Sequence, residues 1–465
     1  MTTPPVWSAI FKAYDVRGIV PDELNPQVAW AVGVGLGRFV QTRQPAPTRL
    51  VVGRDMRESG PALARALMAG VATTGLGVVE IGLCSTDMLY FASGHLDAPG
   101  AMLTASHNPA RYNGIKCCLA GAAPIGEESG LREVRAVAEE VIGEAPADPG
   151  AGLAVEHIDL LGAFAEHVHS FVDIAALAPL RIVADTANGM GGLVCPRVFE
   201  GLPFSLEVLF GELDGTFPNH PADPIQIENQ AALRARILET GADVGLAFDG
   251  DADRVFLVDE RGEPLSGSTT TAIVAKAMLD KHPGATILHN LICSHAVPEI
   301  VRENGGTPVR TRVGHSFIKG VMAETGAVFG GEHSGHYYFR ENFRADSGII
   351  AAVVVLEVVS RAGIPLSELR RPYERYGDSG EINTEVADPK GVIAQIAETV
   401  TARGARTDFF DGLTADFGEW WFNLRPSNTE PLLRLNVEAP DAASCAARVE
   451  EMVGLIAELG GRTED

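Results

Sequence analysis

The chain contains the run Asp249-Gly250-Asp251-Ala252-Asp253-Arg254 between two apolar segments, residues 244–248 and 255–258. Two short apolar segments joined by an Asp-Gly turn predict two buried strands connected by a tight turn. Packing does not explain three carboxylates at alternate positions, because like charges this close repel and raise one another's pKa unless a cation neutralises them. Oxygen ligands from one short loop favour a hard divalent cation, Mg2+ or Ca2+. Arg254 adds a planar guanidinium that can bind an anion beside the metal.

This loop has two other interpretations. Asp and Gly are ordinary turn residues, so it can be a solvated acidic turn, although three alternate Asp residues with an Arg favour a binding site. It can also be the calcium loop of an EF-hand, since Glu260 stands where that loop has its last ligand. However, Arg254 replaces the glycine of the EF-hand turn, and residues 255–258 have the character of a buried strand. An EF-hand is therefore excluded, and a metal site between two strands is favoured.

Short apolar strands alternate with amphipathic helices through most of the chain. Strands are predicted at residues 50–52, 78–81, 181–184, 243–248 and 286–288, and helices at residues 62–71, 231–238 and 270–279. Repeated strand–helix–strand units indicate α/β domains with mixed, mostly parallel sheets. Near the end the pattern changes to strands at residues 420–424 and 432–437 and a helix at residues 442–459, which predicts an α+β domain.

The length of 465 residues is enough for three or four domains at roughly 150 residues each. A linker rich in Pro and Ala at residues 144–150 breaks both periodicities and marks the end of a first domain. The other boundaries are placed at the Asp loop and near Arg371. We therefore expect four domains, three similar α/β domains and a C-terminal α+β domain, at residues 1–150, 151–254, 255–370 and 371–465.

Composition excludes several classes of protein. The formal net charge of −24 does not suit binding to nucleic acid or to an anionic membrane surface. None of the six cysteines belongs to a Cys-x-x-Cys pair, which is typical of reduced thiols in a cytosolic protein. No signal-peptide pattern is present near residue 1, and the longest apolar run, residues 349–359, is too short to span a bilayer. We expect a cytoplasmic protein that binds neither nucleic acid nor a membrane, with a buried helix at residues 349–359.

Three glycines at alternate positions, Gly33, Gly35 and Gly37, invite comparison with a dinucleotide-binding turn. They lie inside a helical pattern, do not follow a predicted strand, and lack the last glycine of that motif at its required spacing. A close-packed helix over residues 31–38 is the better interpretation.

Residues 104–109, Thr-Ala-Ser-His-Asn-Pro, follow an apolar stretch and offer a candidate nucleophile. Ser106 would be that nucleophile, with His107 beside it and Lys116 ten residues further on. The alternative is an Asn-Pro turn capped by hydroxyl groups. No Gly-x-Ser-x-Gly elbow surrounds the serine, so an esterase-type nucleophile is not indicated.

Residues 331–336, Gly-Glu-His-Ser-Gly-His, form a second polar loop after an apolar run. Glu332 and Ser334 can bind neighbouring sugar hydroxyls, because a carboxylate accepts two hydrogen bonds. The alternative is a loop in which His333 and His336 are simply solvated. A metal site is weaker, because no further His or Cys is nearby to complete it.

Residues 425–431 lie between the two predicted strands of the C-terminal domain. They offer an Arg, two hydroxyls, an amide and turn N–H groups, which together can bind a phosphate dianion. The candidate side chains are Arg425, Ser427, Asn428 and Thr429. A plain hairpin loop capped by Ser and Asn explains the same residues equally well.

Basic residues also accompany other loops of this acidic chain. They are Arg17, in a turn that also holds Tyr14, and, later, Arg312, His315 and Lys319. Cations near motif loops suggest an anionic ligand, and the alternative is the usual scatter of surface charge.

Taken together, the motifs resemble the α-D-phosphohexomutase family. The matching segments are residues 104–109, 214–220, 249–254, 331–336 and 425–431, in the family's order and spacing, and the resemblance runs from Tyr14 to about Glu438. The turn at residues 14–18 and the form of the 331–336 loop are most similar to the bacterial phosphomannomutase/phosphoglucomutase branch. The resemblance implies four domains around a central cleft and hexose phosphates as substrates, in a monomer or a homodimer.

The resemblance also implies a mechanism. Phosphorylated Ser106 would donate its phosphoryl group to a hexose 6- or 1-phosphate, giving a hexose 1,6-bisphosphate that is both intermediate and activator, and would then take back the other phosphate. One Mg2+ per chain would be held by Asp249, Asp251, Asp253 and an oxygen of phospho-Ser106. Mannose phosphates, and glucose phosphates too, would be interconverted.

The resemblance further implies two sets of site residues. The catalytic residues would be Ser106, His107, Lys116, Arg254, Arg17, His315 and His336. Lys116 and Arg254 would stabilise charge on the transferring phosphoryl group, and Lys116 is also a candidate general base. The substrate-binding residues would be Tyr14, Arg17, His315, Glu332, Ser334, His336, Arg425, Ser427, Asn428 and Thr429. The last four would hold the phosphate that is not reacting. One departure is that residues 288–294 contain no Lys, where some relatives have one.

Three rival functions are considered. A mutase for glucosamine or N-acetylglucosamine phosphates would use the same motifs. A metal-dependent sugar phosphatase would use the Asp loop but would not need the distant anchor at residues 425–429. A non-catalytic sensor of sugar phosphates would need neither Ser106 nor three aspartates.

Overall fold

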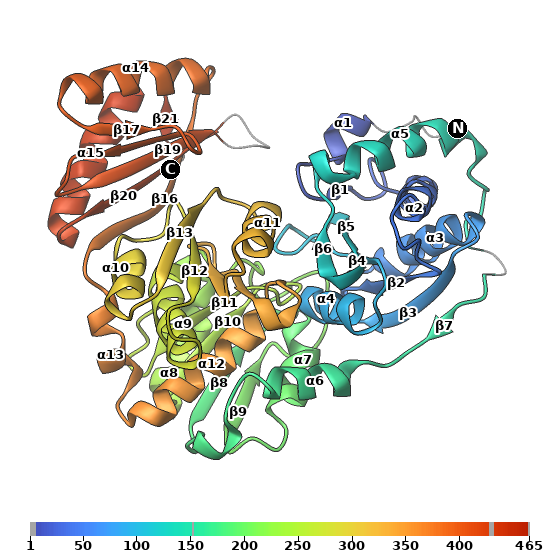
Figure 1. Cartoon of the computed structure of the whole chain (residues 1–465), viewed down its shortest axis with the longest axis horizontal. Coiled ribbons are helices and arrows are strands. Elements are labelled where there is room, and N and C mark those ends of the chain that lie inside the picture. Colours follow the sequence, from blue (N-terminus) through green and yellow to red (C-terminus); the bar gives the residue numbers. More distant parts are fainter. Residues whose placement is uncertain (1–5, 151–152, 427–431, 464–465) are drawn as a thin grey trace.

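The computed structural model describes residues 6–150, 153–426 and 432–463. Four β-sheets, each with its own helices, follow one another along the chain (Figure 1). In this view the N-terminal domain (blue) and the C-terminal domain (red) stand on opposite sides, and the two middle domains lie below and between them. Residues from all four line a shared cavity. The expected fold of three α/β domains and one α+β domain around a central cleft is confirmed.

The first domain contains a seven-stranded mixed sheet in the order β1-β5-β4-β2-β3-β7, with β6 paired to β5. Its strands are β1 Val16–Ile19, β2 Arg49–Arg54, β3 Gly77–Leu83, β4 Gly100–Leu103, β5 Tyr112–Leu119, β6 Ala123–Pro124 and β7 Glu156–His157. Its helices are α1 Trp7–Ile10, α2 Pro26–Gln41, α3 Gly60–Thr73, α4 Thr86–His95 and α5 Leu131–Val141. Helices α2, α3 and α5 share one core, whereas α4 belongs to a core that continues into the middle domains.

The second and third domains have four-stranded sheets in the orders β11-β10-β8-β9 and β13-β12-β14-β15. The second contains β8 Arg181–Asp185, β9 Ser205–Leu209, β10 Val244–Phe248, β11 Val255–Asp259, α6 Leu161–His169, α7 Gly191–Phe199 and α8 Ala231–Thr240. The third contains β12 Thr286–Asn290, β13 Thr307–Thr311, β14 Phe329–Gly331, β15 Tyr337–Phe339, α9 Gly267–Lys281, α10 Ala296–Glu303, α11 His315–Thr325, α12 Gly348–Ala362 and α13 Leu366–Leu369. Because β11 pairs with β10, the second sheet continues past residue 254, where the sequence placed a domain boundary.

The three α/β domains share one strand arrangement. In the second and third sheets the first strand lies between the second and third, parallel to both, and the fourth is antiparallel to the third. Strands β2, β3, β4 and β5 of the first domain repeat this arrangement. The turn between the third and fourth strands therefore has the same place in each domain, and these turns are residues 104–111, 249–254 and 332–336.

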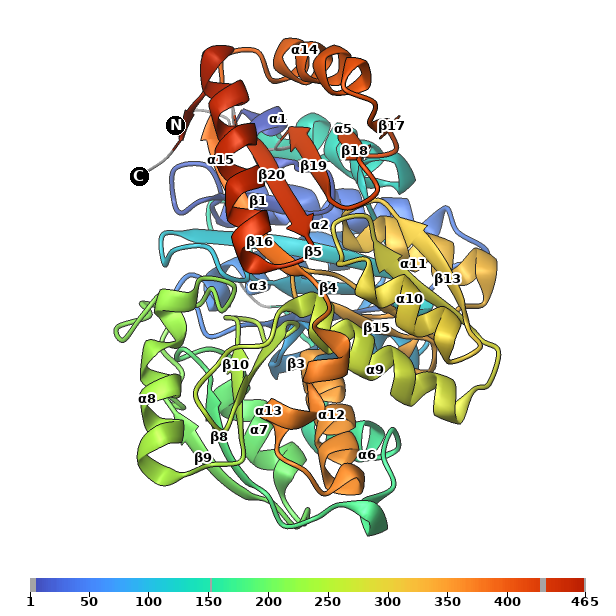
Figure 2. The same ribbon diagram turned by 90° about the vertical axis from the view of Figure 1, so that its left-hand side faces the viewer.

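The C-terminal domain contains a six-stranded antiparallel sheet in the order β17-β18-β19-β20-β16-β21. Its elements are β16 Gly377–Glu385, β17 Arg406–Asp408, β18 Leu413–Asp416, β19 Trp421–Pro426, β20 Leu432–Ala439, β21 Arg462–Thr463, α14 Pro389–Ala402 and α15 Ala442–Glu458. Figure 2 shows α15 lying against β16 and β20. The strands and the final helix predicted for this domain are confirmed to within a few residues.

The predicted helix at residues 349–359 lies within α12 and is almost entirely buried. Among the described residues, no helix is by itself long and apolar enough to cross a bilayer. In the described part of the chain, α12 and residues 366–373 reach that length and composition only as a pair, and the two segments meet at a bend of 91°.

Helices α2 and α3 approach closely because glycines stand at their contact. A Cβ atom on Gly33 would lie 2.2 Å from the carbonyl oxygen of Leu67, and one on Gly70 would lie 2.1 Å from that of Trp30. Neither contact leaves room for a side chain, since backbone atoms cannot move aside cheaply. The interpretation of residues 31–38 as a close-packed helix is confirmed.

We expect Gly33→Ala to lower the free energy of unfolding by about 1–3 kcal/mol, because the two helices must separate to admit the methyl group. Gly143→Ala is the matched control, since a Cβ atom there meets nothing within 4 Å. Urea denaturation followed by circular dichroism measures both variants. Equal stabilities for the two variants would contradict the prediction.

Asp87 is buried where the first domain meets the third. Its Oδ2 accepts a hydrogen bond from Ser347 Oγ at 2.6 Å, and its other oxygen accepts one from Ser85. These two serines are the N-caps of α4 and α12. Burial raises the pKa of Asp87 to about 7, although the two serine hydroxyls oppose the shift.

Because this acid has a higher pKa when folded than when unfolded, the folded state binds the extra proton between about pH 4 and pH 7. We therefore expect stability to fall as pH rises through this range, by on the order of 3–4 kcal/mol for this group. Asp87→Asn should flatten the dependence, whereas the exposed Asp22→Asn should leave it unchanged. Denaturation at several pH values checks this, and identical slopes for wild type and Asp87→Asn would refute it.

Candidate active site

Ser106 and the Asp loop meet although they are far apart in the chain. Ser106 Oγ donates a hydrogen bond to Asp249 Oδ2 at 2.7 Å, across 143 residues. Lys116 Nζ, on β5, lies 2.8 Å from both Asp251 Oδ2 and Asp253 Oδ2. The equivalent turns of the first two domains are thus joined by direct polar contacts. The resemblance of the sequence motifs to the phosphohexomutase family implied this convergence.

The three aspartates suit a divalent cation. Carboxylate oxygens of Asp249, Asp251 and Asp253 all lie within 4.8 Å of one another, and the side chains are buried. Asp251 Oδ1 and Asp253 Oδ1 have no hydrogen-bond partner within the described part of the chain. A buried carboxylate oxygen without a partner is costly, and a cation removes that cost. The donor set, all carboxylate oxygen, fits Mg2+.

Charge within the triad is unevenly compensated. Burial raises the pKa of Asp249 well above its usual value; Arg254 opposes this, and Asp251 and Asp253 add to it. Burial would also raise the pKa of Asp251, but Lys116 and its hydrogen bond lower it overall. The pKa of Lys116 is raised in turn by Asp251 and Asp253, although burial opposes the shift. The two aspartates thus favour the charged form of Lys116.

Arg57 builds the loop that carries Ser106. Its buried guanidinium, paired with Asp55, donates to the carbonyl oxygens of Ser106 at 2.8 Å and Asn108 at 2.7 Å. It also donates to the carbonyl oxygens of two further residues, Pro109 and Tyr112. Ser106 itself has φ of +49°, a strained backbone angle for a non-glycine residue. One fully buried cation thus holds the loop in a shape that exposes the serine Oγ to the aspartates.

The sequence did not identify Arg57, nor two other residues that support the Asp loop. Thr86 Oγ1 donates to Asp251 Oδ2 at 2.6 Å, and Asp223 lies 3.6 Å from Arg254 Nη1. The available signal for Arg57 was its position just after β2, since ligand sites gather at the carboxyl ends of parallel strands.

Arg254 connects the Asp loop to the third domain. Its Nε donates to Asp249 Oδ2 at 2.9 Å, and its backbone forms an isolated bridge with His336. Its Nη2 is buried and lacks a hydrogen-bond partner among the residues that the structure describes. This free end of a guanidinium is suited to an anionic group such as a phosphoryl oxygen.

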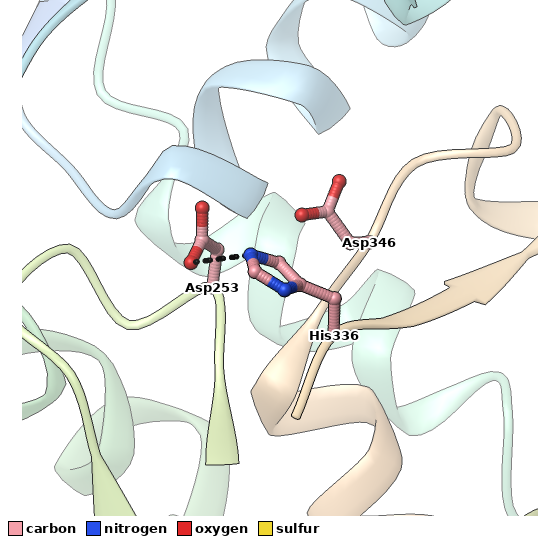
Figure 3. Close-up of side chains that lie close together, drawn as sticks. All are labelled: Asp253, His336 and Asp346. Atoms are coloured by element: carbon pink, nitrogen blue, oxygen red, sulfur yellow. Dashed lines mark ion pairs between the residues drawn. The ribbon is translucent and has the colours of Figure 1, made fainter. Parts of the chain in front are cut away.

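His336 lies among three carboxylates. Figure 3 shows its ring between Asp253 and Asp346. His336 Nε2 is 3.7 Å from Asp253 Oδ1, and its Nδ1 is 3.8 Å from Glu332 Oε2 and 3.0 Å from Ser334 Oγ. The His336 ring also lines the cavity next to Arg254, so it is placed to contact a ligand bound there.

Lys319 differs from the expectation of a cation beside an anionic ligand, and Glu332 is held by hydrogen bonds within the protein. Lys319 is only 2 % exposed, pairs with Asp346 at 2.8 Å and lies 3.7 Å from the centre of the Tyr90 ring. It is therefore a buried partner of an aspartate and does not line the cavity. Glu332, also 2 % exposed, already accepts hydrogen bonds from Tyr338 Oη at 2.6 Å and from Asn290 and the Gly314 N–H, both at 3.2 Å.

Several of the predicted residues line a cavity of about 630 Å³. Its polar lining includes Tyr14, Arg17, Ser106, His107, Lys116, Arg254, His336 and Arg434. Arg17 pairs with Asp15 at 2.5 Å and donates to Asn108, and His107 Nδ1 is 3.3 Å from Ser106 Oγ. His315 is the first residue of α11. A basic cavity in so acidic a chain fits an anionic ligand.

Of the four residues predicted to bind the non-reacting phosphate, the structure describes Arg425. Arg425, at the end of β19, pairs with Glu381 at 2.6 Å, and Arg434 lies 3.3 Å from the same carboxylate. Ser427, Asn428 and Thr429 lie outside the described residues.

Comparison with known proteins agrees with this arrangement. Models of the phosphoglucomutase/phosphomannomutase family match for α/β/α domain I at residues 8–141, domain II at residues 162–262, domain III at residues 266–376 and the C-terminal domain at residues 381–455. Phosphohexose mutases of Xanthomonas campestris pv. campestris are 42 % identical over 450 residues, covering 96 % of this chain and 98 % of theirs. A phosphomannomutase of Salmonella montevideo is 39 % identical over 455 residues, with the same coverage.

Among solved structures, a phosphoglucomutase/phosphomannomutase family protein from Burkholderia thailandensis superposes with a TM-score of 0.85 at 30 % identity, covering 98 % of this chain and 99 % of that one. Together with the four domains and their shared cavity, these matches define the class of the protein as a phosphohexomutase, an isomerase. More particularly, the chain belongs to the phosphoglucomutase/phosphomannomutase family.

Proposed function

We propose that the protein interconverts the 6- and 1-phosphates of mannose, and also those of glucose, through a phosphoserine at Ser106 and a hexose 1,6-bisphosphate. The observation that carries this proposal is the 2.7 Å contact between Ser106 Oγ and Asp249 Oδ2, with Lys116 on the other two aspartates of the loop. Relatives named phosphomannomutase support mannose as the sugar.

The first half-reaction transfers the phosphoryl group from Ser106 Oγ to the free hydroxyl oxygen of a hexose phosphate. The bond from phosphorus to Ser106 Oγ breaks as the bond to the sugar oxygen forms, and the hydroxyl proton leaves to a nearby base. The second half-reaction is the reverse, with the other phosphate of the bisphosphate returning a phosphoryl group to Ser106. Phosphoryl transfer of this kind depends mainly on positioning and on neutralisation of charge.

The residues of the cavity can meet these needs. Asp249, Asp251 and Asp253, with an oxygen of phospho-Ser106, would hold one Mg2+, which supplies positive charge next to the phosphoryl group. Lys116 and the free end of Arg254 would stabilise the equatorial oxygens. His336, surrounded by carboxylates, is positioned to exchange the hydroxyl proton, and Arg17 and His315 would contact phosphate.

The far end of the substrate would be held by the other domains. Ser334 would contact sugar hydroxyls with Glu332, whose orientation is set by Tyr338 and Asn290. Arg425, Ser427, Asn428 and Thr429 would bind the phosphate that is not reacting, and Tyr14 would complete the wall. We also propose a cytoplasmic location, which the six buried free cysteines support, and a monomer or homodimer.

A coupled assay tests the proposal. Purified protein with Mg2+ and a trace of glucose 1,6-bisphosphate is given mannose 1-phosphate, glucose 1-phosphate or glucosamine 1-phosphate, and the 6-phosphate formed is measured with a linked dehydrogenase or by chromatography. We expect the highest kcat/KM for mannose 1-phosphate. A higher kcat/KM for glucosamine 1-phosphate would show that the sugar is glucosamine and not mannose. Release of inorganic phosphate at the rate of substrate loss would show that the enzyme is a phosphatase and not a mutase.

A further inference from the structure

Three domains meet at the backbone of Val313 and Gly314, just before α11. Two successive N–H groups there donate to carboxylates from different domains. The Val313 N–H donates to Asp411 Oδ2 of the C-terminal domain at 3.0 Å, and the Gly314 N–H donates to Glu332 Oε1 of the third domain at 3.2 Å. This segment is therefore held from both sides by negative charge.

The first domain closes the third side of this junction. Tyr14 Oη donates to the carbonyl oxygen of Val313 at 3.4 Å. Gly314 has φ of +127°, and a Cβ atom on it would lie 2.4 Å from Tyr14 Oη, so only glycine fits. Burial, and then Glu332 and Asp411, raise the pKa of Tyr14 to about 12, so its hydroxyl stays a donor. The segment that leads into His315 thus has one fixed shape when all three domains are in place.

Asp411 is in turn fixed to the strand that carries Arg425. Its backbone oxygen accepts a hydrogen bond from Asn423 Nδ2, on β19, at 3.0 Å. The next residue, Gly412, has φ of +67°, and a Cβ atom on it would lie 2.5 Å from the carbonyl oxygen of Leu424. The loop that carries Asp411 is therefore packed tightly on β19 and moves with Arg425.

We propose that Asp411 is a positioning residue for the reaction. Through its hydrogen bond with the Val313 N–H, the conformation of residues 312–315 depends on the position of the C-terminal domain. The inference rests on the proposed function, because Glu332, His315 and Arg425 are its substrate contacts. When the C-terminal domain packs against the third domain, the Asp411 carboxylate accepts a hydrogen bond from the Val313 N–H, and residues 312–315 keep the conformation described above. When the domain moves away, the Val313 N–H loses its partner and the lead into α11 is released.

A second contact between the same two domains provides a control. Asp408, three residues earlier in the chain, pairs with Arg310 through side chains that are both partly exposed. This pair can help the domains dock, but it does not touch the Val313–Gly314 backbone. If docking alone mattered, loss of Asp408 and loss of Asp411 would have the same effect.

The test compares Asp411→Ala, Asp411→Asn and Asp408→Ala in the full-length protein. We expect Asp411→Ala to raise KM for mannose 1-phosphate by about tenfold or more, the scale of one lost hydrogen bond to a charged group. Asp411→Asn should recover most of this, because an amide oxygen can still accept the Val313 N–H. Asp408→Ala should change KM by less than about twofold, as exposed ion pairs do.

A second measurement does not depend on turnover. Hydrogen–deuterium exchange of a peptide covering residues 310–318 should be faster in Asp411→Ala than in wild type and in Asp408→Ala. Equal exchange and equal KM in Asp411→Ala and Asp408→Ala would overturn the proposal. If wild type turns over no hexose phosphate but the exchange difference is present, the proposed function fails while the contact stands.

Discussion

Ser106→Ala is expected to abolish mutase turnover, with a loss in kcat on the order of 10⁴-fold or more, as when other enzymes lose a nucleophile. The alanine has no oxygen to carry the phosphoryl group between the two positions of the sugar. The rest of the site should survive, because Arg57 holds the loop through backbone carbonyl oxygens and not through the serine side chain. Turnover is measured with saturating glucose 1,6-bisphosphate, so that failure to prime the enzyme cannot explain the loss.

Two further measurements sharpen this prediction. Intact mass should show one phosphoryl group on the wild-type protein after incubation with glucose 1,6-bisphosphate, and none on Ser106→Ala. Ser170→Ala removes an exposed hydroxyl that bonds only within its own helix, and it should keep both the modification and full turnover. Full activity of Ser106→Ala in the presence of the bisphosphate would sink the phosphoserine mechanism.

The convergence of Ser106 on the Asp loop was predicted from the resemblance to the phosphohexomutase family, on motifs that each follow an apolar stretch. What the sequence did not show is why the motifs converge. The three α/β domains place residues 104–111, 249–254 and 332–336 in the same turn of the same strand arrangement. Burial requires only apolar residues of suitable volume, so sheets with one topology need not share a recognisable sequence.

Residues that act through tertiary contacts escaped sequence analysis. Arg57 reads as an ordinary charged residue near a loop, and only the fold shows that it is fully buried against four carbonyl oxygens. Lys319 was expected beside an anion because it follows other basic residues. Its face of α11 instead points to Asp346 and the ring of Tyr90. Counting charges along a chain does not give the direction in which each one points.

Asp249→Asn is expected to separate two effects of the Asp249 carboxylate. One is its repulsion with Asp251 and Asp253 in the metal-free protein, and the other is its contribution to Mg2+ binding. Without Mg2+, three buried carboxylates repel, and burial together with Asp251 and Asp253 raises the pKa of Asp249. The amide removes one charge; its oxygen can still accept from Ser106 Oγ and Arg254 Nε, and its NH2 group takes the place of the oxygen that accepts the long 3.2 Å bond from the Arg254 backbone N–H. The metal-free variant should therefore be at least as stable as metal-free wild type.

Addition of Mg2+ should reverse that order. Wild type at 100 times its dissociation constant gains about 2.7 kcal/mol of stability from binding, and the variant gains much less because it has lost a charged ligand. Mutase turnover should fall by on the order of 10²-fold or more in the variant. Thermal denaturation in a chelator and in excess Mg2+ measures the first effect, with the exposed Asp280→Asn as control. A variant that still gains full stability from Mg2+ would show that the ion binds elsewhere, because a site built on this loop cannot lose Asp249 without losing affinity.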